Sequence, residues 1–324
     1  MVVNPRRDGY AGVARSCWEG VAVTDTPALV IANPAAKHGE TERLIPVVSQ
    51  LLHNLPHDLV LTERMGHAAE IAAQAADRDL VVAVGGDGTV HEVLNGLMSL
   101  PAETRPALAV LPTGSGNDTR RTLGIPTDLT QAALVVGTGQ RKRFDVGVCN
   151  GVYFNNSFAA GLDAKVTAKA VEYKVTTRRS GLWLYLTALL HVLVHELDSF
   201  NLSISFDGAA PEEHDTLIVA VTNGPTYGGG FFITPDAVAD DGLFDVCMID
   251  PLSLPQALLR LPAVIMGKHT RMKVVHMRRH HSLVIECDTP VPAQIDGEVL
   301  LESRYEIEML PGAIECVVPR TPAS

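Results

Sequence analysis

The chain has 324 residues, of which 46% are hydrophobic and 19% charged, a composition that excludes a disordered or fibrous protein and favours two globular domains. A formal net charge of -11 argues against a protein that coats nucleic acid, whose phosphates require a cationic surface. The five cysteines have no CxxC spacing, which indicates neither a zinc site nor a disulfide framework and fits a reducing cytoplasm.

Two segments resemble targeting or membrane sequences only superficially. Residues 1–25 lack the apolar core of a secretory signal, and we expect a disordered extension. The longest apolar run, residues 181–197, contains His191, His195 and Glu196, so we expect a helix of a folded domain rather than a membrane span. The two histidines have a metal-ligand spacing, but without a third ligand an ordinary helix face is favoured.

Residues 26–143 alternate short β-branched runs with helical segments, the rhythm of βα units. Strands are expected at ALVIANP, LVLTE, LVVAVGG and ALAVLP, and helices at residues 40–53, 66–76 and 89–98. Glycines follow several of these strands at their carboxyl ends. The pattern predicts a doubly wound α/β domain that binds a nucleotide.

After residue 143 alternating strands dominate, from FDVGVCN and VYFNNSFAAG to SLVIE, AQIDGE and YEIEML. Their spacing predicts a second domain, a β-sandwich over residues 144–305, with helices at 162–174, 182–196 and 254–266. The last segment, about residues 306–324, is a candidate to return to the first domain.

The glycine turn GGDGTV follows an all-apolar strand and precedes a helix. Its glycines let backbone N–H groups approach a phosphate closely, and the helix start adds a positive dipole end. The negative charge of Asp87 would repel a phosphate bound here, and a cation bound between the two would remove this repulsion. The alternative is a tight turn with Asp87 as the helix N-cap.

A second glycine turn, PTGSGND, follows the next strand, so the two turns together build a phosphate cradle. Ser115 can donate to phosphate oxygens, Asn117 can bind backbone or substrate, and Asp118 is a candidate outer ligand of magnesium. The alternative is a plain loop with a helix cap. The loop NPAAKHG and Thr62 would complete the same rim, although Thr62 alone is typical of a helix cap.

The ordered motifs NPAAKHG, LTERMGHA, GGDGTVHEVLNGL, PTGSGND, FDVG, NSFAAGLDA, NGPTYGGGFFITPDAVADDGLFDV and QIDGE resemble the diacylglycerol kinase catalytic-domain family, which includes bacterial diacylglycerol kinases and sphingosine and ceramide kinases. The resemblance spans about residues 28–318. It implies an NAD kinase/diacylglycerol kinase-like nucleotide domain followed by the β-sandwich. This sequence departs from the family pattern in the first loop, where Lys37 and His38 stand at the place of a glycine.

The resemblance also implies roles for particular residues. Those expected to contact ATP are Asn33, Pro34, Ala35, Ala36, Lys37, Thr62, Gly85, Gly86, Asp87, Gly88, Thr89, Val90, His91, Gly114, Ser115 and Asn117. Those expected to hold a catalytic magnesium are Asp87, Asp118 and Asp145, and those expected to hold a structural magnesium are the Asp241 carboxylate and the carbonyls of Val238 and Leu243. Arg121 matches a position associated with anionic membranes.

Glu298 of QIDGE would be the general base, with Asp296 beside it, also by resemblance. The chemistry is reasonable, because a lipid alcohol is a poor nucleophile at neutral pH and a nearby carboxylate must take its proton. Without the other motifs, DGE would be read as a turn.

The sequence therefore predicts an ATP-dependent, magnesium-requiring lipid kinase, most simply one that converts diacylglycerol to phosphatidic acid. A sphingoid-base or ceramide kinase, an NAD kinase-like enzyme and a non-catalytic sensor are the alternatives. The expected setting is the cytoplasm, peripherally at the inner membrane face. The expected partner is a lipid in an anionic membrane rather than a nucleic acid. The sequence does not decide whether the protein forms a homodimer.

Two further features bear on the lipid. The stretch from Arg260 to His281 holds six Lys or Arg and no acid, which indicates either a solvated face or contact with anionic lipid. A lipid tail would need an apolar slot, for which the 182–197 helix, Phe158, Phe231 and Phe232 are candidates, although core packing explains each of them equally well.

Overall fold

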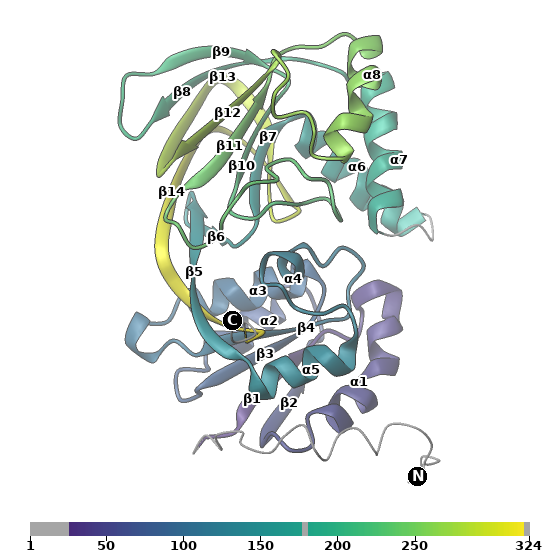
Figure 1. The fold of residues 1–324 in the computed structure, drawn as a ribbon, viewed down its shortest axis with the longest axis vertical. Coiled ribbons are helices and arrows are strands. Elements are labelled where there is room, and N and C mark those ends of the chain that lie inside the picture. Colours follow the sequence, from purple (N-terminus) through teal and green to yellow (C-terminus); the bar gives the residue numbers. More distant parts are fainter. Residues whose placement is uncertain (1–25, 177–180, 321–324) are drawn as a thin grey trace.

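The computed structural model describes residues 26–176 and 181–320, which form two halves joined by two long strands (Figure 1). The predicted extension at residues 1–25 lies outside the described residues. Among the residues that are described, no helix is both long and apolar enough to cross a membrane.

The amino-terminal half is a parallel sheet covered by helices on both faces. Its strands are β1 (Ala28–Ala32), β2 (His57–Leu61), β3 (Leu80–Gly85) and β4 (Ala107–Pro112). Its helices are α1 (Glu40–Leu51), α2 (His67–Ala72), α3 (Asp87–Met98), α4 (Asp118–Thr122) and α5 (Leu129–Thr138), with short 3-10 turns at Ala36–Gly39 and Ala102–Thr104. The strand order is β2-β1-β3-β4, and α1 and α5 cover one face while α2 and α3 cover the other (Figure 1).

This half confirms the predicted doubly wound α/β class. Strands β1, β3 and β4 are buried along their whole length, as continuous apolar runs in a covered parallel sheet must be. The predicted helix at 66–76 is shorter in the structure, and α5 was not among the predicted elements. The Asp128 side chain caps α5 by accepting from the Gln131 N–H at 2.9 Å.

The second half is built from antiparallel strands with helices along one side (Figure 1). Its strands are β5 (Gln140–Cys149), β6 (Val152–Phe154), β7 (Ser157–Gly161), β8 (Phe200–Phe206), β9 (Glu212–Thr216), β10 (Ile218–Thr222), β11 (Phe244–Ile249), β12 (Val275–His280), β13 (Ser282–Ile295) and β14 (Glu298–Val318). Its helices are α6 (Leu162–Thr176), α7 (Gly181–His195) and α8 (Leu254–Ile265), close to the predicted ranges.

One strand, β14, makes both halves parts of a single sheet. It has 21 residues, pairs with β13 in the upper half, and reaches the lower half, where Cys316 pairs in parallel with Leu108 of β4 (Figure 1). Strand β5 runs antiparallel to it over the same span. The chain therefore crosses between the halves once on β5 and once, in return, on β14.

Several strand predictions are corrected by these pairings. The boundary placed at residue 143 falls inside β5, because the strand already begins at Gln140. The run over residues 152–161 is two strands, since Asn155 and Asn156 turn the chain between β6 and β7. Strands β9 and β12 were not predicted, because their charged residues hide the alternation that marks a strand.

Arg105 ties the end of α3 to β14 where this strand packs on the core of the amino-terminal half. Its guanidinium donates to the carbonyls of Leu97 at 3.1 Å and Leu100 at 2.9 Å, at and just after the carboxyl end of α3, and to the Ala313 carbonyl of β14 at 2.6 Å. Carbonyls at the end of a helix lack the partners that a continuing helix would supply, so the cation stabilises this end and connects it to β14.

We predict that Arg105→Met lowers the free energy of unfolding by about 2–3 kcal/mol, because several partly buried carbonyls lose a charged donor. Urea unfolding followed by circular dichroism measures the change. The control is Arg304→Met, because Arg304 forms only exposed ion pairs with Glu286 and Glu306 and should cost less than about 1 kcal/mol. Equal losses in the two variants would contradict the role given to Arg105.

Candidate active site

The two glycine turns touch one another at the carboxyl ends of β3 and β4. A Cβ built on Gly114 would lie 2.3 Å from the Gly86 Cα, and one built on Gly86 would lie 3.1 Å from the Gly114 Cα. A Cβ cannot lie 2.3 Å from backbone, so position 114 requires glycine, while a Cβ at position 86 would be tightly packed against Gly114. The contact aligns the backbone of both turns along one rim, as expected for a phosphate cradle.

Asp87 is the first residue of α3, and Gly86 is the N-cap, with an extended backbone. The alternative that made Asp87 the N-cap is therefore wrong. The Asp87 carboxylate accepts from the Thr119 N–H at 3.1 Å. Burial, and then the nearby charge of Asp118, raise the pKa of Asp87 to about 6.

Asp118 is buried and its carboxylate is already occupied. It accepts from the Thr226 hydroxyl at 3.0 Å and from the Gly229 N–H at 2.7 Å, both in the second half of the molecule. It also accepts from Arg121 at 2.6 Å. Asp118 therefore joins the second glycine turn to the loop over residues 226–229, and Arg121, predicted to face a membrane, is held by Asp118.

The first loop begins with Asn33, whose amide donates to the Thr89 hydroxyl at 3.2 Å and whose carbonyl oxygen accepts from the Ala35 N–H at 3.0 Å. Lys37 and His38, which depart from the family pattern, both adopt positive φ angles of 51° and 56°. They thus follow the backbone path for which a glycine is better suited. Lys37 is exposed and pairs with Glu40 at 2.8 Å.

The QIDGE turn connects β13 to β14 and faces the glycine turns from the other half. Asp296 accepts from three consecutive backbone N–H groups, those of Asn155 at 3.0 Å, Asn156 at 3.1 Å and Ser157 at 2.9 Å. The side chain of Glu298 is 58% exposed and lies over the cleft. The Asp296 carboxylate therefore holds the turn in place, whereas the Glu298 carboxylate is accessible to a ligand in the cleft.

His91 of α3 lies between these two acids. Its Nδ1 is 3.2 Å from an Asp296 oxygen and its Nε2 is 3.9 Å from a Glu298 oxygen. The ring is buried, so it belongs to the interface of the two halves rather than to the open cleft.

A cleft of about 440 Å³ separates the glycine turns from the QIDGE turn. The residues singled out from the sequence that line it are Asn33, Ala35, Ala36, Lys37, Gly86, Asp87, Gly88, Thr89, Gly114, Ser115, Asp118, Asp296 and Glu298. Those that do not line it are Pro34, Thr62, Gly85, Val90, His91 and Asn117. Glu92, Thr119, Tyr185, Tyr227 and Gln294 line it without having been named, although the motifs around most of them were recognised.

Asp145 is not brought into the cleft. Its carboxylate accepts from the Gly242 N–H and the Gly312 N–H, both at 2.7 Å. The structure therefore does not support its expected place beside Asp87 and Asp118 on one magnesium. The Asp145 carboxylate instead holds Gly312, in the bulge of β14 between Leu310 and Ile314.

The expected structural magnesium site also differs. The Asp241 carboxylate forms an ion pair with Arg279 and accepts from the Leu243 N–H at 3.2 Å. Val238 is half exposed on the same loop. With a guanidinium on the carboxylate, this geometry does not favour a cation.

The surroundings of Asp87 do fit a magnesium ion. A Cβ on Gly116 would lie 2.8 Å from the Asp87 Oδ2, so this glycine keeps the space beside the carboxylate open. Among the described residues no group of three or more His, Cys, Asp or Glu could hold a metal. Magnesium commonly binds through one or two carboxylates together with phosphates and water, which is what Asp87 offers.

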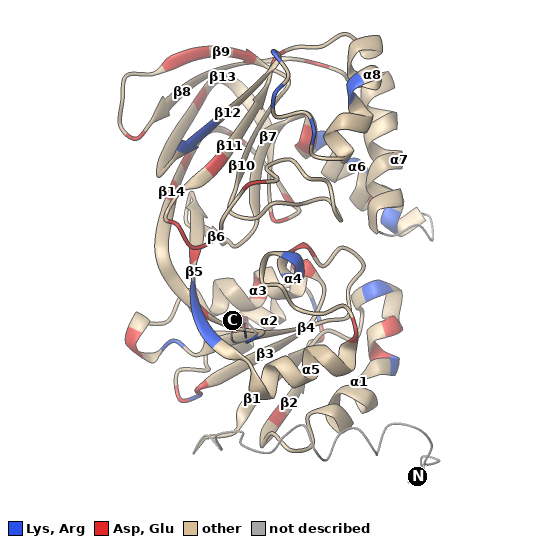
Figure 2. Ribbon diagram, in the orientation of Figure 1, with Lys and Arg blue, Asp and Glu red and all other residues tan. Residues whose placement is uncertain are grey.

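In the basic stretch at residues 260–281, the two arginines of β12 form ion pairs with acids. Arg278 and Arg279 lie on β12 and pair with Glu212 at 3.0 Å and with Asp241, respectively. Figure 2 shows Lys and Arg interspersed with Asp and Glu across both halves rather than gathered into one basic face. The solvated-face interpretation therefore fits β12.

Fold and cleft together define a two-domain kinase-type protein with an NAD kinase-like β-sandwich. Residues 27–149 match the diacylglycerol kinase catalytic domain, and residues 156–318 match the YegS C-terminal NAD kinase beta sandwich-like domain. The "Probable lipid kinase YegS-like" proteins of Yersinia pestis and Yersinia pseudotuberculosis are 30% identical over 267 residues, which is 80% of this chain and 86% of theirs.

Solved structures of a diacylglycerol kinase and of an NAD kinase have the same fold as this chain. A crystal structure of a diacylglycerol kinase from Bacillus anthracis superposes with a TM-score of 0.74 at 29% identity and covers 91% of this chain and 97% of that one. An NAD kinase from Archaeoglobus fulgidus in complex with ATP shares only the fold, with a TM-score of 0.52 at 13% identity. The chain belongs to the diacylglycerol kinase catalytic-domain family and, within it, to the YegS-like lipid kinases.

We predict that Gly114→Ala abolishes measurable ATP binding and lowers the free energy of unfolding by about 1–3 kcal/mol, because its methyl group would collide with Gly86 backbone. Calorimetric titration with ATP and urea unfolding check the two effects. Gly88→Ala is the matched control for stability, since nothing lies within 4 Å of its Cβ. A Gly114→Ala protein as stable as the control would contradict the close contact.

Proposed function

We propose that the protein is an ATP-dependent lipid kinase that transfers the γ-phosphate to the primary hydroxyl of diacylglycerol. The observation that carries this proposal is the pairing, across one cleft, of two abutting glycine turns with the exposed Glu298 carboxylate. The turns suit a triphosphate, and the carboxylate suits an acceptor alcohol.

In this proposal each acid has a separate task. Glu298 takes the proton of the lipid hydroxyl as its oxygen bonds to the γ-phosphorus. Asp87 would hold magnesium, which when bound supplies charge neutralisation at the phosphates. Backbone N–H groups of the two glycine turns would orient the nucleotide, and Asp118 keeps the turns and the 226–229 loop in place.

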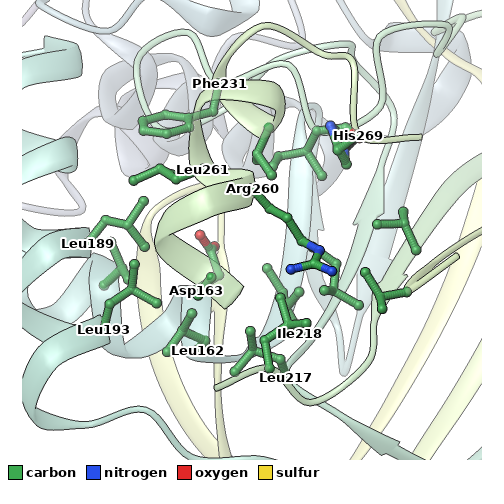
Figure 3. A pocket seen from close by; sticks show the side chains of 18 of the residues that line it. Leu162, Asp163, Leu189, Leu193, Leu217, Ile218, Phe231, Arg260, Leu261 and His269 are labelled. Carbon is green, nitrogen blue, oxygen red and sulfur yellow. Dashed lines mark hydrogen bonds between the residues drawn. The ribbon is translucent and has the colours of Figure 1, made fainter. Parts of the chain in front are cut away.

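An apolar cavity of about 100 Å³ among α6, α7, α8 and β10 supports a lipid acceptor (Figure 3). Leu189, Leu193 and Leu261 point into it. Tyr185 and Tyr227 line both this cavity and the cleft, so the cavity adjoins the cleft over which Glu298 lies. Burying one methylene contributes about 0.8 kcal/mol, so a short acyl segment there would contribute substantially to lipid affinity.

The cavity has a polar end beside the cleft. The hydroxyl of Tyr185 donates to Asp163, and the Gln294 amide donates to the same carboxylate at 3.2 Å. Burial raises the pKa of Asp163, and the hydrogen bonds from Tyr185 and Gln294 oppose this effect only in part. The resulting pKa is about 6. The Gln294 carbonyl oxygen accepts from the Gly297 N–H at 2.8 Å, which connects the acyl cavity to the turn that carries Glu298.

The deciding experiment supplies purified protein with ATP, magnesium and one acceptor at a time, with diacylglycerol, sphingosine, ceramide and NAD as the panel. We expect ATP consumption and a phosphorylated lipid with diacylglycerol. Transfer only to a sphingoid base, to ceramide or to NAD would replace diacylglycerol by that acceptor. ATP binding without transfer to any acceptor would indicate a sensor and reject the proposal.

We predict that Glu298→Gln lowers kcat by about 10²- to 10⁴-fold while the Kd for ATP stays within about threefold, because only the proton acceptor is lost. Initial rates and ATP titration measure the two constants. Glu302→Gln on the same strand is the control, since its exposed side chain lies away from the cleft. A Glu298→Gln enzyme with the wild-type rate would remove Glu298 from its role.

We further propose that the protein docks peripherally on an anionic membrane through α7 and α8. Large apolar side chains are exposed there, with Trp183 at 73%, Leu259 at 80% and Met266 at 57%. Lys268, Arg271 and Lys273 follow α8, and none forms an ion pair with any residue in the described part of the chain. Apolar residues flanked by unpaired cations suit an anionic lipid surface.

Leu259→Glu is therefore expected to weaken sedimentation with phosphatidylserine-containing vesicles at least about tenfold, because a charge replaces an inserted apolar group. Leu301→Glu is the control, since Leu301 is similarly exposed, at 62%, but lies on β14. Equal vesicle binding by the wild type and both variants would argue for another docking face.

A further inference from the structure

His91 is a buried ionisable side chain that the proposed reaction leaves unused. It lies one turn after Asp87 on α3, and its side chain is 4% exposed. A buried imidazole needs defined partners for both ring nitrogens. The partner of Nδ1, Asp296, and the acid nearest to Nε2, Glu298, both come from the opposite half of the molecule, on the QIDGE turn.

The first ring nitrogen is fixed by Asp296. Two backbone N–H groups donate to one carboxylate oxygen, Oδ1, and the Asn155 N–H donates to the other, Oδ2. Four donors, counting His91 Nδ1 at 3.2 Å, surround this carboxylate. Both of its oxygens already accept backbone N–H groups, so the carboxylate acts as the acceptor toward the ring and the Nδ1 of His91 carries the proton.

The second ring nitrogen is left available. The Asn95 amide nitrogen is 3.4 Å from Nε2, but it donates to the His91 carbonyl at 3.0 Å and to the Tyr153 carbonyl at 2.8 Å. Both of its hydrogens are thus used elsewhere. The nearest acid to Nε2 is Glu298, at 3.9 Å, and a small rotation of that exposed side chain closes the gap.

We propose that Asp296, His91 and Glu298 form a proton relay, in which His91 Nε2 takes from Glu298 the proton that the base has removed from the acceptor alcohol. This inference rests on the proposed kinase function. The alcohol oxygen bonds to the γ-phosphorus, the bond from that phosphorus to the ADP oxygen breaks, and the alcohol proton passes to Glu298. It then passes to Nε2, leaving Glu298 ionised and His91 as an imidazolium paired with Asp296, and leaves to solvent after product release.

The charges around the ring support this direction of transfer. Burial disfavours the imidazolium, but the hydrogen bond and charge of Asp296 and the charges of Glu298 and Glu92 outweigh it and raise the pKa of His91. The raised pKa makes neutral His91 a better proton acceptor than an ordinary imidazole. Only neutral His91 can accept, so kcat should rise with pH through the pKa of His91 and level off above it.

Kinetics with two His91 variants test the relay. His91→Gln keeps an amide donor for Asp296 but has no titratable nitrogen, so we expect kcat to fall about tenfold to a hundredfold and the pH dependence assigned to His91 to disappear. In His91→Ala, added imidazole should restore activity in proportion to its neutral fraction. His53→Gln, at an exposed histidine beyond α1, should retain the wild-type profile and show no imidazole effect.

A second measurement does not depend on turnover. Nitrogen-15 NMR of the histidine rings should show the Nδ1–H tautomer for His91, and Glu298→Gln should lower its pKa. An active wild type whose kcat and pH profile survive His91→Gln overturns the relay and leaves the kinase proposal standing. A wild type that phosphorylates no acceptor rejects the proposed function instead, and an unchanged pKa of His91 in Glu298→Gln rejects the coupling of the two groups.

Discussion

The close contact between Gly86 and Gly114 is the constraint on which the rest of the site depends. It holds the ends of β3 and β4 so near that no side chain fits between them. Asp87 and Asp118 are consequently brought together at the start of their helices, where their charges influence one another. A cation at this point would relieve the repulsion between the acids and would bridge them to phosphate.

The acids of the family motifs divide into those that hold the molecule together and those that are available for chemistry. Asp118, Asp145 and Asp296 each accept two or more hydrogen bonds; the donors are backbone N–H groups at Asp145 and mainly so at Asp296, whereas Asp118 accepts from one backbone N–H, a hydroxyl and a guanidinium. They are anchors for the 226–229 loop, the β14 bulge and the QIDGE turn. Of these acids all but Asp145 line the cleft, and among those that do Asp87 and Glu298 accept the fewest hydrogen bonds, which is why we assign the chemistry to them.

The sequence predicted best those features that depend on local pattern. Apolar runs that lead into glycine turns located β3 and β4, and the doubly wound class followed from the alternation of strands and helices. The motifs also located most of the residues that line the cleft, since a phosphate cradle requires glycines at fixed places along the chain. Their arrangement in space agrees with that expectation, whereas the roles given to them stay predictions.

The sequence did not predict features that depend on a distant partner. Asp145 is a motif acid, but its orientation depends on Gly242 and Gly312, which lie far along the chain. Arg121 is held by Asp118, whose own carboxylate is fixed by Thr226 and Gly229 far along the chain, and the sequence alone could equally place the Arg121 side chain at a membrane. Strand β12 was missed because its arginines form pairs with acids on β9 and the 241 loop, an arrangement that no period in the sequence records.

The ribbon of β5 and β14 also determines how the molecule can bend. Its ladder is regular on either side of one register shift, between Leu310 and Ile314, where Gly312 adopts a positive φ of 57°. Within the described residues the backbone passes between the halves on these two strands, so a change in the angle between the halves would bend this ribbon, which is least regular at Gly312. Asp145 accepts from the Gly312 N–H and from the Gly242 N–H, and it therefore restrains the ribbon at this irregular point.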